Sequence, residues 1–463
     1  MKNQMHTESS VMRPGSPATG SAPGTPAHLA ARYRGSEQAA DLLKRLFRRY
    51  PGNLTLKLWD ETALRVGTNA AGGADSPFAL VFRSPEVVWS TVLGKDPLAL
   101  ADAYFRGDLD IEGDFFAALS IKDHLDALQM PAGERLRAAF AALRLRMLNA
   151  AARHSENLFA PVNAPRIKAH SKSENRDAIH FHYDVSNEFY SLWLDRAMVY
   201  SCAYFESPNV DLDAAQQAKL EHICRKLSLK PDERFLDIGC GWGALVIYAA
   251  QHYGVTAHGV TLSPQQLKVA RERIAQAGLA DRVTVELMDY RDLSGDASYD
   301  KVASVGMFEH VGLKNLSVYF GTVNRLLKPH GLFLNHGITH VSEGWQPNLS
   351  TEFINRFVFP DGQLDTVSNI QRVMERSNLE IADVEALRLH YAMTLRHWVA
   401  RLEQNRCRAL QYVNEATYRV WRLYMAACAL QFESGEIGIY QVLAVKRAAG
   451  VPDLPLTRRH LYC

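Results

Sequence analysis

The chain has 463 residues, of which 47% are apolar, a size and composition that suit two or three globular domains. Its 52 lysines and arginines nearly balance its 50 aspartates and glutamates, and the resulting net charge of +2 argues against nucleic acid as a partner. No apolar run approaches the roughly 20 residues that a membrane-spanning helix needs, and no signal-peptide core is evident. The six cysteines show neither CxxC nor zinc-ligand spacing, so we expect reduced thiols and no metal site. These features predict a cytoplasmic protein that contacts a membrane only peripherally.

The first third of the chain contains three segments of different composition. Residues 1–29 are rich in Gly, Pro, Ser and Thr and are predicted to be disordered. Residues 30–154 contain the strand-like runs TLKLWD and ALVFR and the helix-like runs VVWSTVL and ALADAYFRG, which predict a compact N-terminal domain. Residues 155–176 carry two prolines and scattered charges and are expected to be a linker.

Residues 177–463 form the second predicted domain, in which short β-rich runs alternate with helical stretches. The runs are FLDIG, TAHGVTL, VTVELMD, KVASVG and LFLNHGI, and the first two are followed by the helical WGALVIYAAQHYG and PQQLKVARERIAQAG. Such alternation predicts a parallel, doubly wound α/β sheet. Two longer helices are expected over 393–413 and 416–432, and a last strand in IGIYQVLAV.

The run FLDIGCGWG places three glycines, Gly239, Gly241 and Gly243, between a strand and a helix. Glycines at this position permit a tight turn and the close approach of a ligand to the backbone. A nicotinamide-binding turn has the spacing GxGxxG, whereas this one reads DIGCGWG, with Asp237 two residues before the first glycine. That spacing is similar to the nucleotide-binding loop of S-adenosylmethionine-dependent methyltransferases. The alternative is a plain strand-to-helix turn without a ligand.

The next two strands end in residues that could hold a nucleoside. The second strand ends without the acid that commonly binds ribose, and Gln266 on the following helix could replace it. The third strand ends in MDYRDL, where the ring of Tyr290 could stack on an adenine. A half-buried core position for Tyr290 is an equally good interpretation.

Several blocks together, among them HFHYDVSNEFYSLWLD, YSCAYFE, LDIGCGWG, GVTLSPQQ, DYRDL and SVGMFEHVG, resemble the cyclopropane-fatty-acyl-phospholipid synthases, relatives of the mycolic acid cyclopropane synthases. The resemblance covers about residues 170 to 450, and more weakly residues 30 to 150, which resemble the family's lipid-interacting domain. It implies a Rossmann-like methyltransferase domain with a seven-stranded, mostly parallel sheet, preceded by a small α+β domain. It also implies a possible homodimer.

The resemblance implies two groups of site residues. Those expected to bind S-adenosylmethionine are Tyr200, Ser201, Asp237, Gly239, Cys240, Gly241, Trp242, Gly243, Thr261, Leu262, Gln266, Asp289, Tyr290 and Arg291. Those expected to hold a catalytic bicarbonate ion are Cys202, Glu309, His336, the backbone of Ile338, and Tyr391.

The implied reaction adds a methylene group to a cis double bond of a phospholipid acyl chain. Its carbocation must be kept from water, so we expect a dry site with aromatic walls. The candidates for those walls are Phe205, Phe308, Tyr319, Phe353, Phe357 and Phe359, although each is individually more typical of core. The resemblance implies that bicarbonate is the base that completes ring closure.

Three polar residues near this site have competing interpretations. Glu309 would position the bicarbonate, or would itself be the general base. Its neighbour His310 is expected to face the other way, by strand alternation, as a structural histidine. Cys202 is disfavoured as a covalent nucleophile because no activating histidine motif accompanies it.

Unsaturated phospholipids in the bilayer would be the substrate, at the inner face of the cell membrane. In the helical run 134–153, Leu136, Phe140, Leu143 and Met147 form one stripe bordered by arginines, which is typical either of a helix at an anionic membrane surface or of one packed on its own domain. Alternative functions are a methyltransferase that makes methyl-branched lipids and one that acts on an amine. A nicotinamide oxidoreductase and a non-catalytic lipid-binding protein fit the motifs less well.

Overall fold

The structure is a computed structural model that describes residues 29, 31–70, 75–93, 98–128, 131–152, 185–343, 353–354, 356, 358 and 363–462. The linker expected over 155–176, and all of the extension expected to be disordered except residue 29, lie outside these residues. The chain divides into two compact units, which are described separately. No helix in the described ranges is both long enough and apolar enough to span a membrane.

The first unit comprises Met1–Gly94, Asp108–Glu112 and Asp126–Ser155. Its four-stranded sheet has the order β2-β1-β3-β4, in which β1 pairs antiparallel with β2 and parallel with β3. The strands are β1 Leu54–Lys57, β2 Ala63–Val66, β3 Phe78–Phe82 and β4 Leu109–Gly113, and the helices are α2 Ser36–Phe47, α3 Pro85–Leu93 and α6 Ala132–Leu148. The strands expected in TLKLWD and ALVFR are therefore present as β1 and β3.

Two helices that fall within the range expected to form the N-terminal domain belong to the second unit instead. These are α4 (Ala99–Arg106) and α5 (Phe115–Leu119), which pack against α17 (Glu415–Ser434). The guanidinium carbon of Arg422 lies 3.7 Å from the ring centroid of Phe115. Aromatic and cationic groups of these helices thus find their partners far away in sequence, and the chain leaves and re-enters the first unit rather than filling 30–154 continuously.

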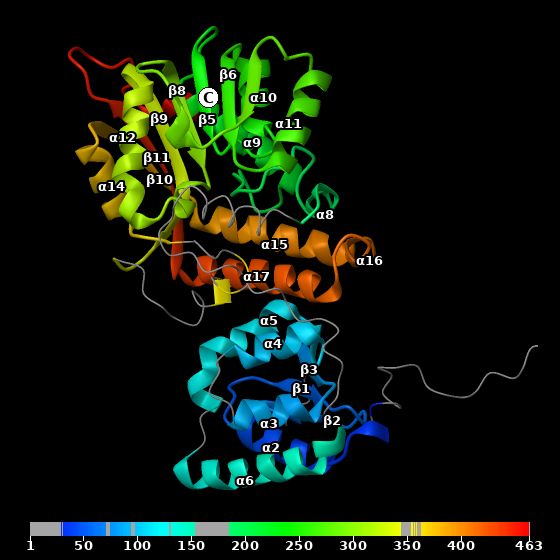
Figure 1. Ribbon diagram of the computed structural model, residues 1–463. Helices are drawn as coiled ribbons and strands as arrows, with labels where there is room; N and C mark the ends of the chain where they lie inside the picture. The colour runs from blue at the N-terminus through cyan, green and yellow to red at the C-terminus, as the bar shows by residue number, and fades with distance from the viewer. Residues whose placement is uncertain are drawn as a thin grey trace, which may run out of the picture. The chain divides into compact units, whose positions relative to one another are not determined.

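The second unit is built on a seven-stranded sheet of order β10-β11-β9-β8-β5-β6-β7, with only β11 antiparallel to its neighbours (Figure 1). This confirms the predicted Rossmann-like fold. The strands are β5 Arg234–Ile238, β6 Thr256–Thr261, β7 Val283–Leu287, β8 Tyr299–Val305, β9 Leu327–His340, β10 Leu379–Ala386 and β11 Ile437–Lys446. The sequence reading missed β10, whose burial pattern is mixed because it lies at the sheet edge.

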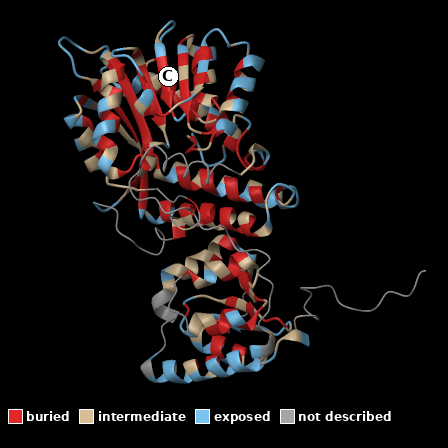
Figure 2. Ribbon diagram, viewed as in Figure 1, coloured by how far each residue is buried: buried red, intermediate tan, exposed pale blue. Residues whose placement is uncertain are grey.

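Helices cover both faces of this sheet, and the strands between them are largely buried (Figure 2). One apolar cluster joins the sheet to α9 (Leu212–Lys226), α10 (Ala244–Tyr253) and α11 (Pro264–Gln276). The other joins it to α12 (Leu316–Leu326) and α14 (Val367–Arg376). Because both faces of the sheet are covered, its central strands are rich in apolar residues. The two longest helices of this unit among the described residues, α15 (Arg388–Gln404) and α17, pack on each other and contact β11.

Replacing either of two glycines of this unit by alanine should change the stability of the protein, in opposite directions. A Cβ at Gly337 in β9 would collide with the ring of Phe308, whereas a Cβ at Gly321 in α12 meets nothing within 4 Å. Gly337→Ala should therefore lower the free energy of unfolding by about 1–3 kcal/mol through overpacking. Gly321→Ala should raise it by about 0.5–1 kcal/mol through helix propensity. Denaturant unfolding of both variants measures this, and equal effects of the same sign would contradict the packing at Phe308.

Candidate functional site

The site begins at the turn between β5 and α10, where Gly239, Gly241 and Gly243 have φ of +87°, +54° and +84°. These left-handed conformations favour glycine over any residue with a side chain. A Cβ at Gly243 would lie 3.2 Å from the Cβ of Ala270 on α11, so this glycine serves close helix packing. A Cβ at Gly241 would meet no atom within 4 Å. The backbone there faces open space in which a ligand can approach it.

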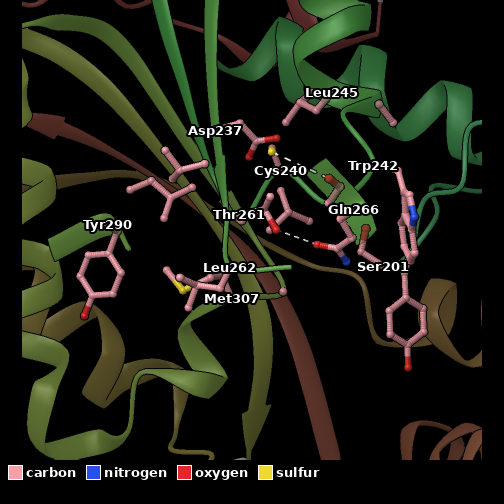
Figure 3. Close-up of a pocket in the computed structure, with 18 of the residues that line it drawn as sticks. Ser201, Asp237, Cys240, Trp242, Leu245, Thr261, Leu262, Gln266, Tyr290 and Met307 are labelled. Carbon is pink, nitrogen blue, oxygen red and sulfur yellow. Dashed lines mark hydrogen bonds between the residues drawn. The ribbon is translucent and has the colours of Figure 1, made fainter. Parts of the chain in front are cut away.

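A pocket opens at this turn, against the carboxyl ends of the parallel strands (Figure 3). Of the residues predicted to bind the cofactor, all but Gly243 line it: Tyr200, Ser201, Asp237, Gly239, Cys240, Gly241, Trp242, Thr261, Leu262, Gln266, Asp289, Tyr290 and Arg291. In Figure 3, Tyr290 lies at one end of the pocket and Trp242 at the other. Open α/β sheets bind ligands at this edge, and the predicted residues come together there from five separate segments of the chain.

Two buried side chains that can carry charge, Asp237 and Lys219, both line this pocket. Burial raises the pKa of Asp237 to about 7 and lowers the pKa of Lys219 to about 8. Lys219 donates a hydrogen bond from Nζ to Ser201 Oγ at 2.9 Å, whereas Asp237 Oδ1 is buried without a hydrogen-bond partner in the described structure. A buried acceptor of this kind is costly unless a ligand satisfies it. The pocket thus offers a carboxylate to a cationic group.

Sequence reasoning missed Lys219, although a signal was present. The residue falls on the inward face of α9, where it is 2% exposed between buried Gln216 and Leu220. A lysine at a core-facing helical position is rare unless it has a partner. The helical period could therefore have singled it out, but only the fold shows that it lines this pocket and bonds to Ser201.

At one wall the segment after β6 fixes a glutamine. The Thr261 hydroxyl donates to Gln266 Oε1 at 2.8 Å, and Ser263 caps α11 by accepting the Gln266 backbone N–H. These bonds hold Gln266 against the pocket in place of the acid that other nucleotide-binding folds use for ribose.

At the opposite wall, Asp289 orders the segment that carries Tyr290. The carboxylate of Asp289 caps the short helix Tyr290–Asp292 and pairs with Arg291 at 2.6 Å. Tyr290 is buried in the apolar cluster beside Tyr319, with ring centroids 5.3 Å apart, and it also lines the pocket. Tyr290 therefore belongs to the core and also to the pocket wall, and its stacking on an adenine stays a prediction.

A second pocket adjoins the first, and all five residues predicted to hold bicarbonate line it: Cys202, Glu309, His336, Ile338 and Tyr391. The two pockets share Tyr200, Ser201, Val305, Gly306 and His310 in their linings. A group bound in one pocket therefore borders the contents of the other.

Glu309 sits on a short 3₁₀ turn, Phe308–His310, that follows β8. Its Oε1 accepts the backbone N–H of Ile338 at 2.8 Å, and its Oε2 is buried without a partner among the described residues. Burial raises the pKa of this carboxyl, and the Ile338 hydrogen bond opposes that shift. This differs from the expected role of Ile338, whose N–H orients Glu309 and is not available to an ion.

His336 is fully buried on β9, and burial lowers its pKa well below the usual range, so the ring is neutral. The amide Nε2 of Gln441, its cross-strand neighbour on β11, lies 3.4 Å from Nδ1. With Nδ1 accepting from that amide, the ring proton resides on Nε2. Nε2 is buried with no partner in the part of the chain that the structure describes. His336 thus presents a donor in the wall of the same pocket that Glu309 lines with its acceptor, and Gln441 is a residue that sequence reasoning missed.

Cys202 is a buried thiol whose Sγ donates to Ala203 O at 3.3 Å. Burial raises its pKa far above the usual range, so the nucleophilic thiolate is not formed near neutral pH. The structure therefore gives no support to covalent catalysis at this position.

Two expectations about the cavity were wrong. His310 lines both pockets instead of facing away, because Glu309 and His310 lie on a 3₁₀ turn and not on an alternating strand. The aromatic side chains of the second pocket are Tyr200, Tyr391, Tyr424 and Phe432. None of the candidates Phe205, Phe308, Tyr319 and Phe353 lines it, and Phe357 and Phe359 lie outside the described residues.

A Rossmann-like sheet with this glycine turn and a pocket at the carboxyl ends of its strands is the fold of S-adenosylmethionine-dependent methyltransferases. A family model described as mycolic acid cyclopropane synthetase matches residues 170–442, and the chain belongs to that family.

Three relatives place the chain within the family. It is 41% identical over 414 residues to a probable fatty acid methyltransferase of Pseudomonas putida, covering 88% of this chain and 96% of the relative. It is 42% identical over 262 residues to the cyclopropane-fatty-acyl-phospholipid synthase of Escherichia coli K12, covering 57% of this chain and 66% of the relative. The structure of the cyclopropane synthase MmaA2 from Mycobacterium tuberculosis superposes with a TM-score of 0.56 at 30% identity, covering 58% of this chain and 98% of that one.

The buried carboxyl of Asp237 predicts a pH-dependent affinity for S-adenosylmethionine. Because its pKa is raised to about 7, the carboxyl is protonated below that pH and loses its attraction for the cationic cofactor. Affinity should fall about tenfold from about pH 8 to about pH 6, and protonation of Lys219 acts in the same direction. Asp237→Asn should bind at least tenfold more weakly and lose most of this pH dependence.

Isothermal titration calorimetry across that range measures both effects. Asp281→Asn, which removes an exposed carboxylate, is the matched control and should behave like the native protein. An Asp237→Asn variant with native affinity would show that this carboxylate does not contact the cofactor.

Proposed function

We propose that the protein transfers a methylene group from S-adenosylmethionine to the cis double bond of unsaturated phospholipid acyl chains. The product is a cyclopropane fatty acid, formed through a carbocation that bound bicarbonate deprotonates. The observation that carries this proposal is that Glu309 Oε2 and His336 Nε2 are both buried without partners in the described structure, and that both residues line one cavity that adjoins the cofactor pocket.

The second pocket has the lining that an acyl chain requires. Most of its wall is apolar and includes Ile354, Leu364, Leu395, Ile437 and Ile439. Burial of apolar chain in such a cavity is favoured by about 25 cal/mol per Å², and the same walls exclude the water that would capture a carbocation. The rings of Tyr391 and Phe432, whose centroids are 4.8 Å apart, offer aromatic faces to a cation.

The two unpartnered atoms suit bicarbonate because that ion carries both a hydroxyl and negative oxygens. Glu309 Oε2 can accept a hydrogen bond from the hydroxyl, and His336 Nε2–H can donate to a negative oxygen. Tyr391 lines the same cavity and carries a hydroxyl. When bound, the ion supplies a base of suitable strength, while the protein residues hold it and orient it.

The atoms and electrons of the proposed reaction balance. The π electrons of the double bond form a C–C bond to the methyl carbon as its C–S bond breaks, and S-adenosylhomocysteine leaves. One proton is then lost from the new methyl group, and the released electron pair closes the ring onto the cationic carbon. The acyl chain gains CH₂ in total.

A second candidate is methyl branching without ring closure. Two relatives that match more than four fifths of this chain, at 41% and 35% identity, are named probable fatty acid methyltransferases. Loss of a different proton from the same carbocation would give a methyl-branched olefin, and hydride transfer from a reduced nicotinamide, as an added co-reactant, would give a saturated methyl branch. Ring closure and methyl branching share every step up to the carbocation, and the cavity suits those shared steps equally well.

The test is mass spectrometry of acyl chains after incubating the protein with unsaturated-phospholipid vesicles and S-adenosylmethionine. We expect a gain of CH₂ that resists hydrogenation under conditions that saturate olefins, and a rate that falls when bicarbonate is removed. Glu309→Gln should lower the rate by a factor on the order of 10²–10⁴ while S-adenosylmethionine affinity stays native. Glu272→Gln, an exposed substitution on α11, should have no effect.

Other products would redirect the proposal. A CH₂ gain that still behaves as an olefin, or a saturated methyl branch, establishes the methyl-branching function. A full rate without bicarbonate, combined with loss of activity in Glu309→Gln, makes Glu309 itself the base. If the protein binds the cofactor but forms no lipid product, both cyclopropanation and methyl branching are ruled out, and an amine acceptor is favoured.

Substitution of Gln441 should lower kcat, because Gln441 determines which nitrogen of His336 carries the proton. Gln441→Leu should lower kcat about tenfold and leave the KM for S-adenosylmethionine unchanged, because the ring loses the partner that places its proton on Nε2. Gln441→Glu should be more severe, since a carboxylate would draw the proton to Nδ1. Tyr440→Phe, on the opposite face of β11, is the control, and a native kcat in both Gln441 variants would rule out this positioning role.

A further inference from the structure

Helix α6 of the first unit carries a group of exposed apolar side chains. Leu136, Phe140 and Met147 are 75%, 76% and 71% exposed, and Leu143 is 45% exposed. Of the fifteen exposed large apolar side chains in the described residues, five belong to this helix. Single exposed apolar residues are ordinary, whereas a contiguous group marks an interaction site.

The opposite face of α6 is the one that packs within its unit. Ala138, Ala142 and Leu145 are fully buried, and the helix contacts α2 and α3. At about 100° per residue, the exposed stripe spans about 60° and lies roughly opposite Leu145. The burial pattern therefore excludes the interpretation in which this stripe packs on its own domain.

Contacts at both ends of α6 keep the stripe turned outward. Buried Asn149 accepts the backbone N–H of Arg34 at 2.9 Å and donates to the Arg34 carbonyl at 2.9 Å. At the other end, Glu134 pairs with Arg48 at 3.2 Å. Rolling the helix to hide the stripe would break these contacts and expose Leu145.

Exposed arginines border the stripe on both sides. Arg137 and Arg144 follow one edge, and Arg135 and Arg146 follow the other. Guanidinium groups bind phosphate oxygens in a fork geometry, and their long apolar stems can lie along a hydrocarbon surface while the charge reaches the headgroups. An apolar stripe between two cationic edges is the pattern of a helix in the plane of an anionic bilayer.

We propose that the α6 stripe, together with these four arginines, docks the protein on a bilayer that contains anionic phospholipid. A second copy of the chain is a less suitable partner for the stripe than a bilayer. Two-fold pairing of two stripes would bring their rows of arginines towards each other, and these like charges repel. The biological role of this docking rests on the proposed function, in which the substrate lies in the bilayer. Binding to the bilayer itself does not require the reaction to take place. It can therefore be tested on lipids that cannot be substrates.

The experiment is co-sedimentation of the full chain with fluid vesicles of saturated dimyristoyl lipids, which contain no double bond. We expect tighter binding to mixed phosphatidylglycerol and phosphatidylcholine than to phosphatidylcholine alone, and weaker binding at high salt. Leu136→Gln with Phe140→Gln should weaken binding to both vesicle types at least tenfold. Arg144→Glu with Arg146→Glu should remove the preference for anionic vesicles.

Matched controls remove similar groups from the second unit. Leu287→Gln with Val318→Gln replaces two exposed apolar residues, and Arg372→Glu with Arg376→Glu reverses two exposed arginines on α14. Both should bind vesicles like the native protein, and all four variants should keep native S-adenosylmethionine affinity. Native vesicle binding by both α6 variants overturns the proposal. So does a native dimer that Leu136→Gln with Phe140→Gln converts to a monomer without changing vesicle binding.

Discussion

The cost of burying polar groups without partners is the constraint on which this site depends. Asp237, Glu309 and His336 each hold a buried polar atom that no described residue satisfies, and each such atom costs about 1–3 kcal/mol in a folded protein. The fold tolerates them because the surrounding sheet is closed by apolar clusters on both faces. Ligands that satisfy these atoms would therefore gain affinity, because they offset a desolvation cost that folding already incurs.

The segment Tyr200–Cys202 connects the cofactor pocket to the second cavity. Tyr200 and Ser201 line both, and Cys202 lines the second. Lys219 holds this segment by its bond to Ser201, and Gln216, one turn earlier on α9, donates to the Ser201 carbonyl at 2.8 Å. Helix α9 thus sets the boundary across which a methyl group must pass, and a change in its buried polar face would alter both cavities together.

The sequence predicted those features whose physical cause is local. A strand, three glycines and a helix specify a tight turn wherever they occur, because only glycine readily adopts the left-handed conformations found at Gly239, Gly241 and Gly243. The alternation of strands and helices likewise indicated the parallel sheet. It did not reveal Lys219 or Gln441, since each acts through a partner brought close by the fold, Ser201 and His336. It misassigned His310 because a strand and a 3₁₀ turn point consecutive side chains in different directions, and β8 ends only three residues before the turn.

Taken alone, the sequence determined the fold class, the glycine turn and the presence of an arginine-bordered apolar stripe, and its resemblance to a known family indicated many of the residues that gather at two adjoining pockets. The tertiary structure decided which of these groups face one another. It placed the Ile338 N–H on Glu309 and buried the face of α6 that carries Ala138 and Leu145, so that Phe140 faces outward. Local periodicity can show that a helix has two apolar faces, but only packing against the rest of the unit selects the one that is buried, because that choice depends on the shape of the partner surface.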